Sequence, residues 1–161
     1  MYTMRHWAVR HAKGMKKIYA LLEWTLVQLS PLMTKIGFDR LEGLVYFVEK
    51  RIKNLMLDSQ SCGQCIVGST GMSCPMNCPK SLRNGPCGGV RQDGGCEVDA
   101  GMTCVWVLAW QGNKQMAEDV YPIQTVQPAI DNRRWNKSAW LHELTLKTKN
   151  TKAEPLRMVD S

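Results

Sequence analysis

The residues of this sequence best suited to chemistry are its seven cysteines, all of which lie within residues 62–104. Cys62 and Cys65 have two residues between them, a spacing at which two thiolates of one turn can reach the same metal ion or cluster. Cys74 and Cys78 have three residues between them and a proline after the second, which repeats the ending of the bacterial ferredoxin run. The other thiols belong to Cys87, Cys96 and Cys104. Residue types and spacing together predict a thiolate-bound metal.

Two interpretations of the cysteines without a metal fit the sequence less well. A disulfide framework usually has an even number of cysteines and an oxidising compartment. Here the count is odd, and the N-terminal residues lack the pattern of an export signal. Buried thiols without a ligand would need a hydrophobic core, which the Gly- and Pro-rich residues 61–104 do not offer. Metal binding is therefore the favoured interpretation.

The identity of the metal stays open between iron and zinc. We expect a [4Fe–4S] cluster, because the ferredoxin-like spacing suits one and nearby glycines let backbone amides approach the sulfurs. A structural zinc site with four cysteine ligands is the alternative, since zinc also favours cysteine pairs with a two-residue gap. The histidines all lie outside the cysteine segment, so imidazole ligands are not expected. The first-choice ligands are Cys62, Cys65, Cys74 and Cys78, with Cys87, Cys96 and Cys104 as alternates or a second site.

Helices and irregular arms are expected to position these thiols. Apolar residues recur at helical spacing over residues 12–29, with Pro31 marking the end of the helix, and again over residues 39–56. Residues 104–110 fit either a buried strand or a short helix. The predicted fold class is small α plus irregular: an N-terminal helical hairpin, a metal-organised Cys-rich module with little regular secondary structure, and an extended C-terminal arm. The expected domains are 1–58, 59–112 and 113–161.

The net charge of +7 lies mostly away from the cysteines. Residues 1–56 hold ten Lys and Arg against four Asp and Glu, whereas residues 57–110 hold three against four. A zinc ribbon that binds phosphate would carry its basic residues on the metal module itself, so nucleic acid is not the expected partner. An apolar run of about 18 residues, as a membrane span requires, is missing from the sequence. A cytoplasmic location is therefore expected.

A resemblance to a known family is carried by residues 74–89, which read CPMNCPKSLRNGPCGG. Gly95-Cys96-Glu97-Val98 and Cys104-Val105-Trp106 continue it in order, and it extends loosely through residues 127–131. This run resembles the cysteine-rich module of methylenetetrahydrofolate reductases, found at the C-terminus of some of these enzymes or as a small accessory subunit in bacterial complexes. The resemblance covers about residues 60–135 and leaves the role of the N-terminal helices open.

The resemblance implies a subunit that is not catalytic alone. In that family a barrel-fold subunit holds the flavin, FMN or FAD, together with the folate. The small subunit would pass electrons between that flavin and a donor such as a ferredoxin, or hold the complex together; a cluster favours the first role and zinc the second. The alternative function is a zinc-binding structural adaptor that binds protein or nucleic acid through its basic N-terminal arm. The residues expected to serve either as docking anchors or as packing around the cysteines are Trp106, Trp110, Trp135 and Trp140.

Overall fold

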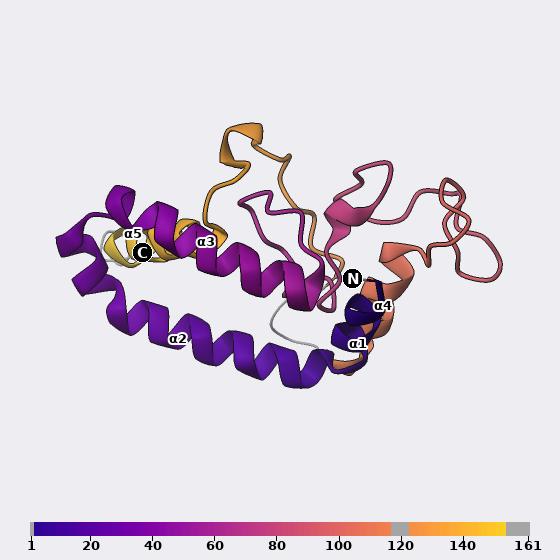
Figure 1. Cartoon of the computed structure of the whole chain (residues 1–161), viewed down its shortest axis with the longest axis horizontal. Helices are drawn as coiled ribbons and strands as arrows, with labels where there is room; N and C mark the ends of the chain where they lie inside the picture. Colours follow the sequence, from indigo (N-terminus) through magenta and orange to yellow (C-terminus); the bar gives the residue numbers. More distant parts are fainter. Residues whose placement is uncertain (1, 117–122, 154–161) are drawn as a thin grey trace, which may run out of the picture.

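The structure, a computed structural model, describes residues 2–116 and 123–153 and is mainly helical (Figure 1). Its α-helices are α1 (Tyr2–Arg10), α2 (Ala12–Ile36), α3 (Phe38–Leu57), α4 (Val105–Gln115) and α5 (Ala139–Ala153). Two 3-10 turns, η1 (Pro75–Asn77) and η2 (Asn132–Arg134), interrupt the irregular segments. In these two ranges the only extended pairing is a single bridge between Gly95 and Thr103. The prediction of a small, mainly helical protein is therefore confirmed for the described residues.

Helices α2 and α3 form the predicted hairpin along the long axis of the molecule (Figure 1). The prediction that the first helix ends at Pro31 is wrong, because α2 continues through this proline to Ile36. Proline costs a helix one backbone hydrogen bond. Packing offsets that cost here, since Met33, two residues further on, is buried against Leu141 and Leu144 of α5. Among the described residues, no helix is both long and apolar enough to cross a membrane.

The expectation of a wholly extended C-terminal arm is also wrong. Residues 123–138 are irregular apart from η2, but α5 follows them and lies beside α3 (Figure 1). The start of α5 is fixed by a contact distant in sequence: the Glu49 carboxylate of α3 accepts hydrogen bonds from the Ala139 and Trp140 amides at 3.2 and 3.3 Å. An acidic group at a helix N-terminus stabilises the helix. The arm is also predicted to end in a polar tail from about residue 147; residues 147–153 instead belong to α5, and the remainder lies outside the described residues.

Helices α1 and α4 pack together at the other end of the hairpin (Figure 1). Residues 105–115 form a helix rather than a strand, with Val105 and Leu108 each 1% exposed. Arg5 of α1 is buried and pairs with Asp58, just after α3, at 2.5 Å. The same guanidinium donates to the Met102 sulfur at 3.8 Å. Helix α1, which the sequence did not separate from the hairpin, therefore joins α3 to the cysteine segment.

The cysteine segment touches α4 through two glycines. Gly71 has a φ of 57°, a left-handed conformation that favours glycine. A Cβ atom at Gly112 of α4 would overlap the Gly71 carbonyl oxygen. The backbones of the helix and of the cysteine segment are therefore in direct contact, with no room for a side chain between them.

Replacing Gly112 by Ala is expected to lower the free energy of unfolding by about 1–3 kcal/mol, because backbone atoms must move apart to admit the methyl group. Gly43 on α3 is the matched control, since nothing lies within 4 Å of a Cβ built there. Gly43→Ala should raise stability by about 0.5–1 kcal/mol through helix propensity alone. Urea unfolding of both variants measures the difference, and equal effects would refute the close approach.

Candidate metal centre

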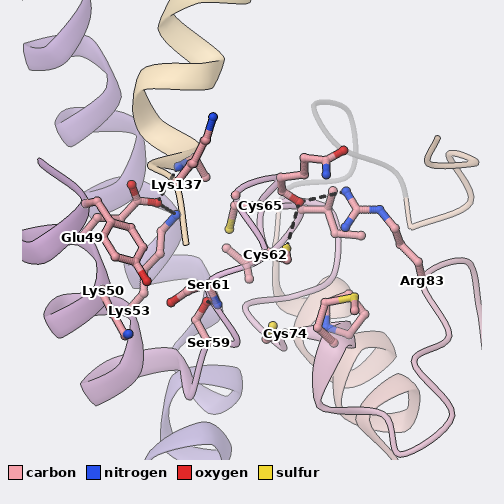
Figure 2. Close-up of a pocket in the computed structure, with 18 residues that line it drawn as sticks. Glu49, Lys50, Lys53, Ser59, Ser61, Cys62, Cys65, Cys74, Arg83 and Lys137 are labelled. Atoms are coloured by element: carbon pink, nitrogen blue, oxygen red, sulfur yellow. Dashed lines mark hydrogen bonds and ion pairs between the residues drawn. The ribbon is translucent and has the colours of Figure 1, made fainter. Parts of the chain in front are cut away.

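The structure divides the seven cysteines into two groups around separate pockets, and none of them forms a disulfide. One pocket, between α3 and the loop that follows it, is lined by a three-thiol group of Cys62, Cys65 and Cys74 (Figure 2). The other pocket, near the start of α4, is lined by a four-thiol group of Cys78, Cys87, Cys96 and Cys104. The first-choice ligand set is thus divided: three of its members line the first pocket, whereas Cys78 lines the second, together with the alternate ligands.

The loop that carries Cys62 and Cys65 is held against η2. Gly63 has a φ of 71°, and a Cβ atom there would overlap the Arg134 carbonyl oxygen, so a side chain at this position would push the loop away. Gln64 adds a hydrogen bond from its side-chain amide to the Asp131 carbonyl oxygen at 3.1 Å. Contacts with the C-terminal third of the chain therefore set the position of the Cys62–Cys65 pair.

Cys74 is the most deeply buried member of the three-thiol group, at 4% exposure. Burial raises the pKa of its thiol to about 11, and the neighbouring Cys65 adds to the increase. Without a metal this cysteine is therefore a neutral thiol at pH 7. A metal would have to displace its proton, and metal affinity at this group should rise with pH.

A short backbone ladder positions two members of the four-thiol group. The Cys96 amide donates to the Met102 carbonyl oxygen at 2.8 Å, and the Cys104 amide donates to the Gly94 carbonyl oxygen at 2.9 Å. These bonds flank the Gly95–Thr103 bridge and place both cysteines beside it. Cys104 also occupies the N-cap position of α4, at the start of that helix.

Glu97 lies next to this group and accepts a hydrogen bond from one of its thiols. Its carboxylate accepts a hydrogen bond from the Cys87 thiol at 3.5 Å and pairs with the ammonium of Lys80. The hydrogen bond from Lys80, followed by that from Cys87, lowers the pKa of Glu97. The carboxylate stays ionised and can orient Cys87.

The four tryptophans expected to serve as docking anchors or as packing around the cysteines differ in burial. Trp106 is 6% exposed and its indole nitrogen donates to the Leu82 carbonyl oxygen at 3.2 Å, so it packs beside the four-thiol group. Trp140 is also buried, next to the three-thiol group. Trp110 and Trp135 are exposed and remain candidates for docking anchors. The sequence alone could not separate the two pairs.

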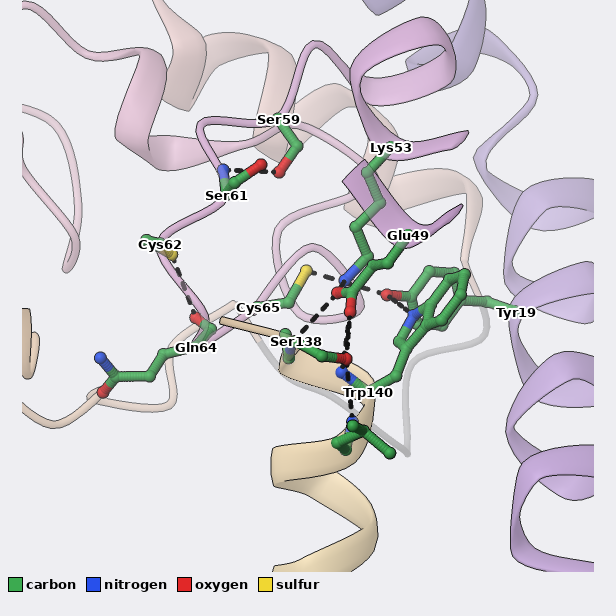
Figure 3. Close-up of polar contacts among 12 residues, drawn as sticks. Tyr19, Glu49, Lys53, Ser59, Ser61, Cys62, Gln64, Cys65, Ser138 and Trp140 are labelled. Carbon is green, nitrogen blue, oxygen red and sulfur yellow. Dashed lines mark hydrogen bonds and ion pairs between the residues drawn. The ribbon is translucent and has the colours of Figure 1, made fainter. Parts of the chain in front are cut away.

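A buried polar network, which the sequence did not predict, borders the three-thiol group (Figure 3). Lys53 pairs with Glu49 at 2.5 Å, and both side chains are only 5% exposed. The signal was present in the sequence, since Glu49 and Lys53 are one helical turn apart. Both lie outside the apolar positions of the helix, where charged residues are usually exposed.

The donor chemistry of both groups suits a thiophilic metal, since every cysteine of the segment is a free thiol. Within residues 2–116 and 123–153, however, no three Cys, His, Asp or Glu side chains are close enough together to hold a metal ion. Binding would therefore require the thiols of a group to close around the metal, as expected when metal binding is coupled to folding. The assignment of ligands stays a prediction.

Comparison with known proteins gives one family. Residues 38–133 match the family model described as "Methylene-tetrahydrofolate reductase C terminal". The matched range begins with α3 and contains both thiol groups, so it reaches further towards the N-terminus than the motifs of the cysteine segment. Neither the curated proteins nor the solved structures gave a match.

Proposed function

The chain belongs to the methylene-tetrahydrofolate reductase C-terminal family, and from this premise we propose that it is the accessory electron-transfer subunit of a methylenetetrahydrofolate reductase complex. An iron–sulfur cluster bound to its thiols would supply a one-electron carrier between a redox donor and the flavin of a barrel-fold catalytic subunit. The flavin and the folate would be bound by that partner subunit.

The observation that supports this proposal most directly is the four-thiol group. Four thiolates are the usual ligand set of a [4Fe–4S] cluster. The group places Cys104 at the N-terminus of α4, fixes Cys96 by a backbone bond, and directs the Cys87 thiol proton at the Glu97 carboxylate; that proton must leave when Cys87 binds a metal as a thiolate. We therefore place the cluster on the four-thiol group rather than on the first-choice set. The three-thiol group offers a second, incomplete ligand set, which would need one further ligand.

Replacing one cysteine in each group tests this placement. In anaerobically purified protein, Cys87→Ser is expected to remove the cluster of about four irons, whereas Cys62→Ser should leave that cluster in place. Iron and sulfide analysis with a visible spectrum measures both. The opposite result would favour Cys62, Cys65, Cys74 and Cys78 as the ligands. Zinc without visible colour would make this a structural module and overturn the electron-transfer role.

The expected partner has an exposed apolar surface to bind. One face of α2 carries apolar side chains that are 45–62% exposed and lie three or four residues apart, except that Thr25 takes the place between the second and the third: Ile18, Leu21, Leu29, Leu32 and Ile36. Leu44, Phe47 and Leu55 of α3 are also exposed. Apolar surfaces of this extent are typical of protein interfaces. Because residues 1–56 carry an excess of basic side chains, the matching surface should be apolar with an acidic rim.

Substituting two residues of the α2 stripe is expected to separate the subunits. Leu21→Gln with Leu32→Gln should reduce the flavoprotein recovered with the chain by about tenfold or more, since interface anchors often contribute over 1 kcal/mol each. Thr34→Gln, an exposed polar position on the same helix, is the control. Flavin absorbance of the purified complex gives the readout. Unchanged recovery would mean that the catalytic subunit binds elsewhere.

A further inference from the structure

The excess positive charge of the N-terminal helices is concentrated at one end of the hairpin. Residues 2–17 contain five Lys or Arg and no Asp or Glu, whereas residues 18–56 contain five Lys or Arg against four Asp or Glu. One of the first five is used inside the protein, because Arg5 is buried and pairs with Asp58. Three others have exposed side chains: Arg10, Lys13 and Lys17. Helix α1 and the first turns of α2 therefore present positive charge without acidic residues of their own.

Two exposed tryptophans lie on the helices at this end. Trp7 of α1 is 44% exposed, and its ring stacks on that of His11 with the centroids 4.6 Å apart. Trp110 of α4, the helix that packs against α1, is 49% exposed. The Lys114 ammonium lies 5.4 Å from the centroid of the Trp110 ring. Tryptophan and arginine are enriched among the anchors of protein interfaces.

These exposed side chains of α1, of the first turns of α2 and of α4 form what we call the basic end: Trp7, Arg10, Lys13, Lys17, Trp110 and Lys114. The three helices meet at one end of the molecule (Figure 1). The apolar stripe of α2 begins at Ile18 and runs from there towards the other end of the hairpin (Figure 1). The basic end and the stripe therefore offer two surfaces of different chemistry.

The basic end adjoins the four-thiol group through α4. The first residues of this helix, Val105 and Trp106, line the four-thiol pocket, and Trp110 follows Trp106 by about one helical turn. Helix α1 contacts the same region, because Arg5 donates to the sulfur of Met102, which lines that pocket. A protein bound at the basic end would therefore lie beside the cysteine segment.

We propose that the basic end docks an acidic protein that carries single electrons, while the apolar stripe of α2 binds the catalytic subunit. This inference rests on the proposed function, which needs an electron donor beside the four-thiol group. One electron would leave the reduced carrier and enter the cluster, so the carrier is oxidised by one electron and no proton or group is transferred. Opposite charges speed the encounter of two proteins, and a central aromatic anchor slows their separation.

A nucleic acid fits this surface less well than an acidic protein. The exposed cations of the basic end cover only a few helical turns, and the adjoining residues 57–110 hold three basic against four acidic side chains. Affinity for a phosphate backbone grows with the number of cations that contact it. A duplex that crossed this end would pass onto a segment of net negative charge.

Association rates test the role of the charges. The full-length chain, purified anaerobically, is immobilised and probed with an acidic ferredoxin and an acidic flavodoxin. Arg10→Gln with Lys13→Gln should lower the association rate about tenfold at low salt and leave the dissociation rate nearly unchanged. The difference should disappear at about 0.5 M salt, where the charges are screened. Lys50→Gln with Arg51→Gln is the matched control, because it removes two exposed cations from α3.

Dissociation rates test the role of the anchor. Trp110→Ala should raise the dissociation rate about tenfold and change the association rate little, because an anchor acts after the encounter. Trp135→Ala is the control, since it removes an exposed tryptophan at the end of η2. Every substituted side chain is exposed, so the variants should fold, which circular dichroism checks.

The outcomes separate this inference from the function on which it rests. Arg10→Gln with Lys13→Gln should keep most of the flavoprotein, whereas Leu21→Gln with Leu32→Gln should keep the binding of the carriers. If neither carrier binds at low salt, or if only duplex DNA or phosphatidylserine vesicles bind at the basic end, the inference is refuted and the proposed function still stands. A chain that binds a carrier through the basic end but purifies without a cluster would support the docking surface and overturn the electron-transfer role.

Discussion

Replacing Glu49 by Ala is expected to destabilise the protein by about 3–5 kcal/mol, because the substitution leaves Lys53 as a buried charge without its partner. It also removes the acceptor of the Ser138 hydroxyl and of two amides at the start of α5. Helix α5 should therefore loosen from α3 before the hairpin itself unfolds. Chemical denaturation followed by helical circular dichroism measures the change.

Two variants control for this prediction. Glu42→Ala removes a carboxylate from the same helix that makes no side-chain hydrogen bond or ion pair with the described residues, and should change stability by no more than about 0.5 kcal/mol. Glu49→Gln with Lys53→Met removes both charges and should recover much of the loss, since a neutral pair has no unpaired ion. A loss under 1 kcal/mol for Glu49→Ala would show that water reaches Lys53.

Removing the proposed cluster is expected to loosen residues 78–104 far more than residues 66–74. The first range contains the whole four-thiol group, and its chain is held by a single bridge and a few turns. Within the second range, Val67 and Met72 are 2% and 0% exposed in a core shared with Ala8 and Ala12. Apolar burial should keep that part ordered when the thiols lose their ligand.

Hydrogen exchange before and after chelation checks this difference. Amides of residues 78–104 should lose protection by about tenfold or more, whereas those of α2 and α3 should change little. A segment can open locally, at a lower free energy than global unfolding requires, without exposing the amides of the packed helices. The Cys87→Ser variant should behave like the chelated protein in the same range. Equal protection with and without metal would mean that protein contacts alone order the cysteine segment.

The sequence by itself determined the features that depend on local pattern. Apolar spacing predicted the hairpin of α2 and α3, because amphipathic periodicity is a property of one stretch of chain. The motif of residues 74–89, with the cysteine runs that follow it, identified the family that the comparison confirmed. Short spacings also predicted the Cys62–Cys65 pair, whose two members line one pocket.

Only the tertiary structure decided which distant residues share a site. Cys74 and Cys78 are close in sequence, yet η1 lies between them and they line different pockets. Helix α5 and the passage of α2 through Pro31 depend on packing between helices far apart in the chain. The position of Lys53 beside the thiols needs α2, α3 and α5 together. Local spacing carries no information on such contacts, because they form only when separate elements pack.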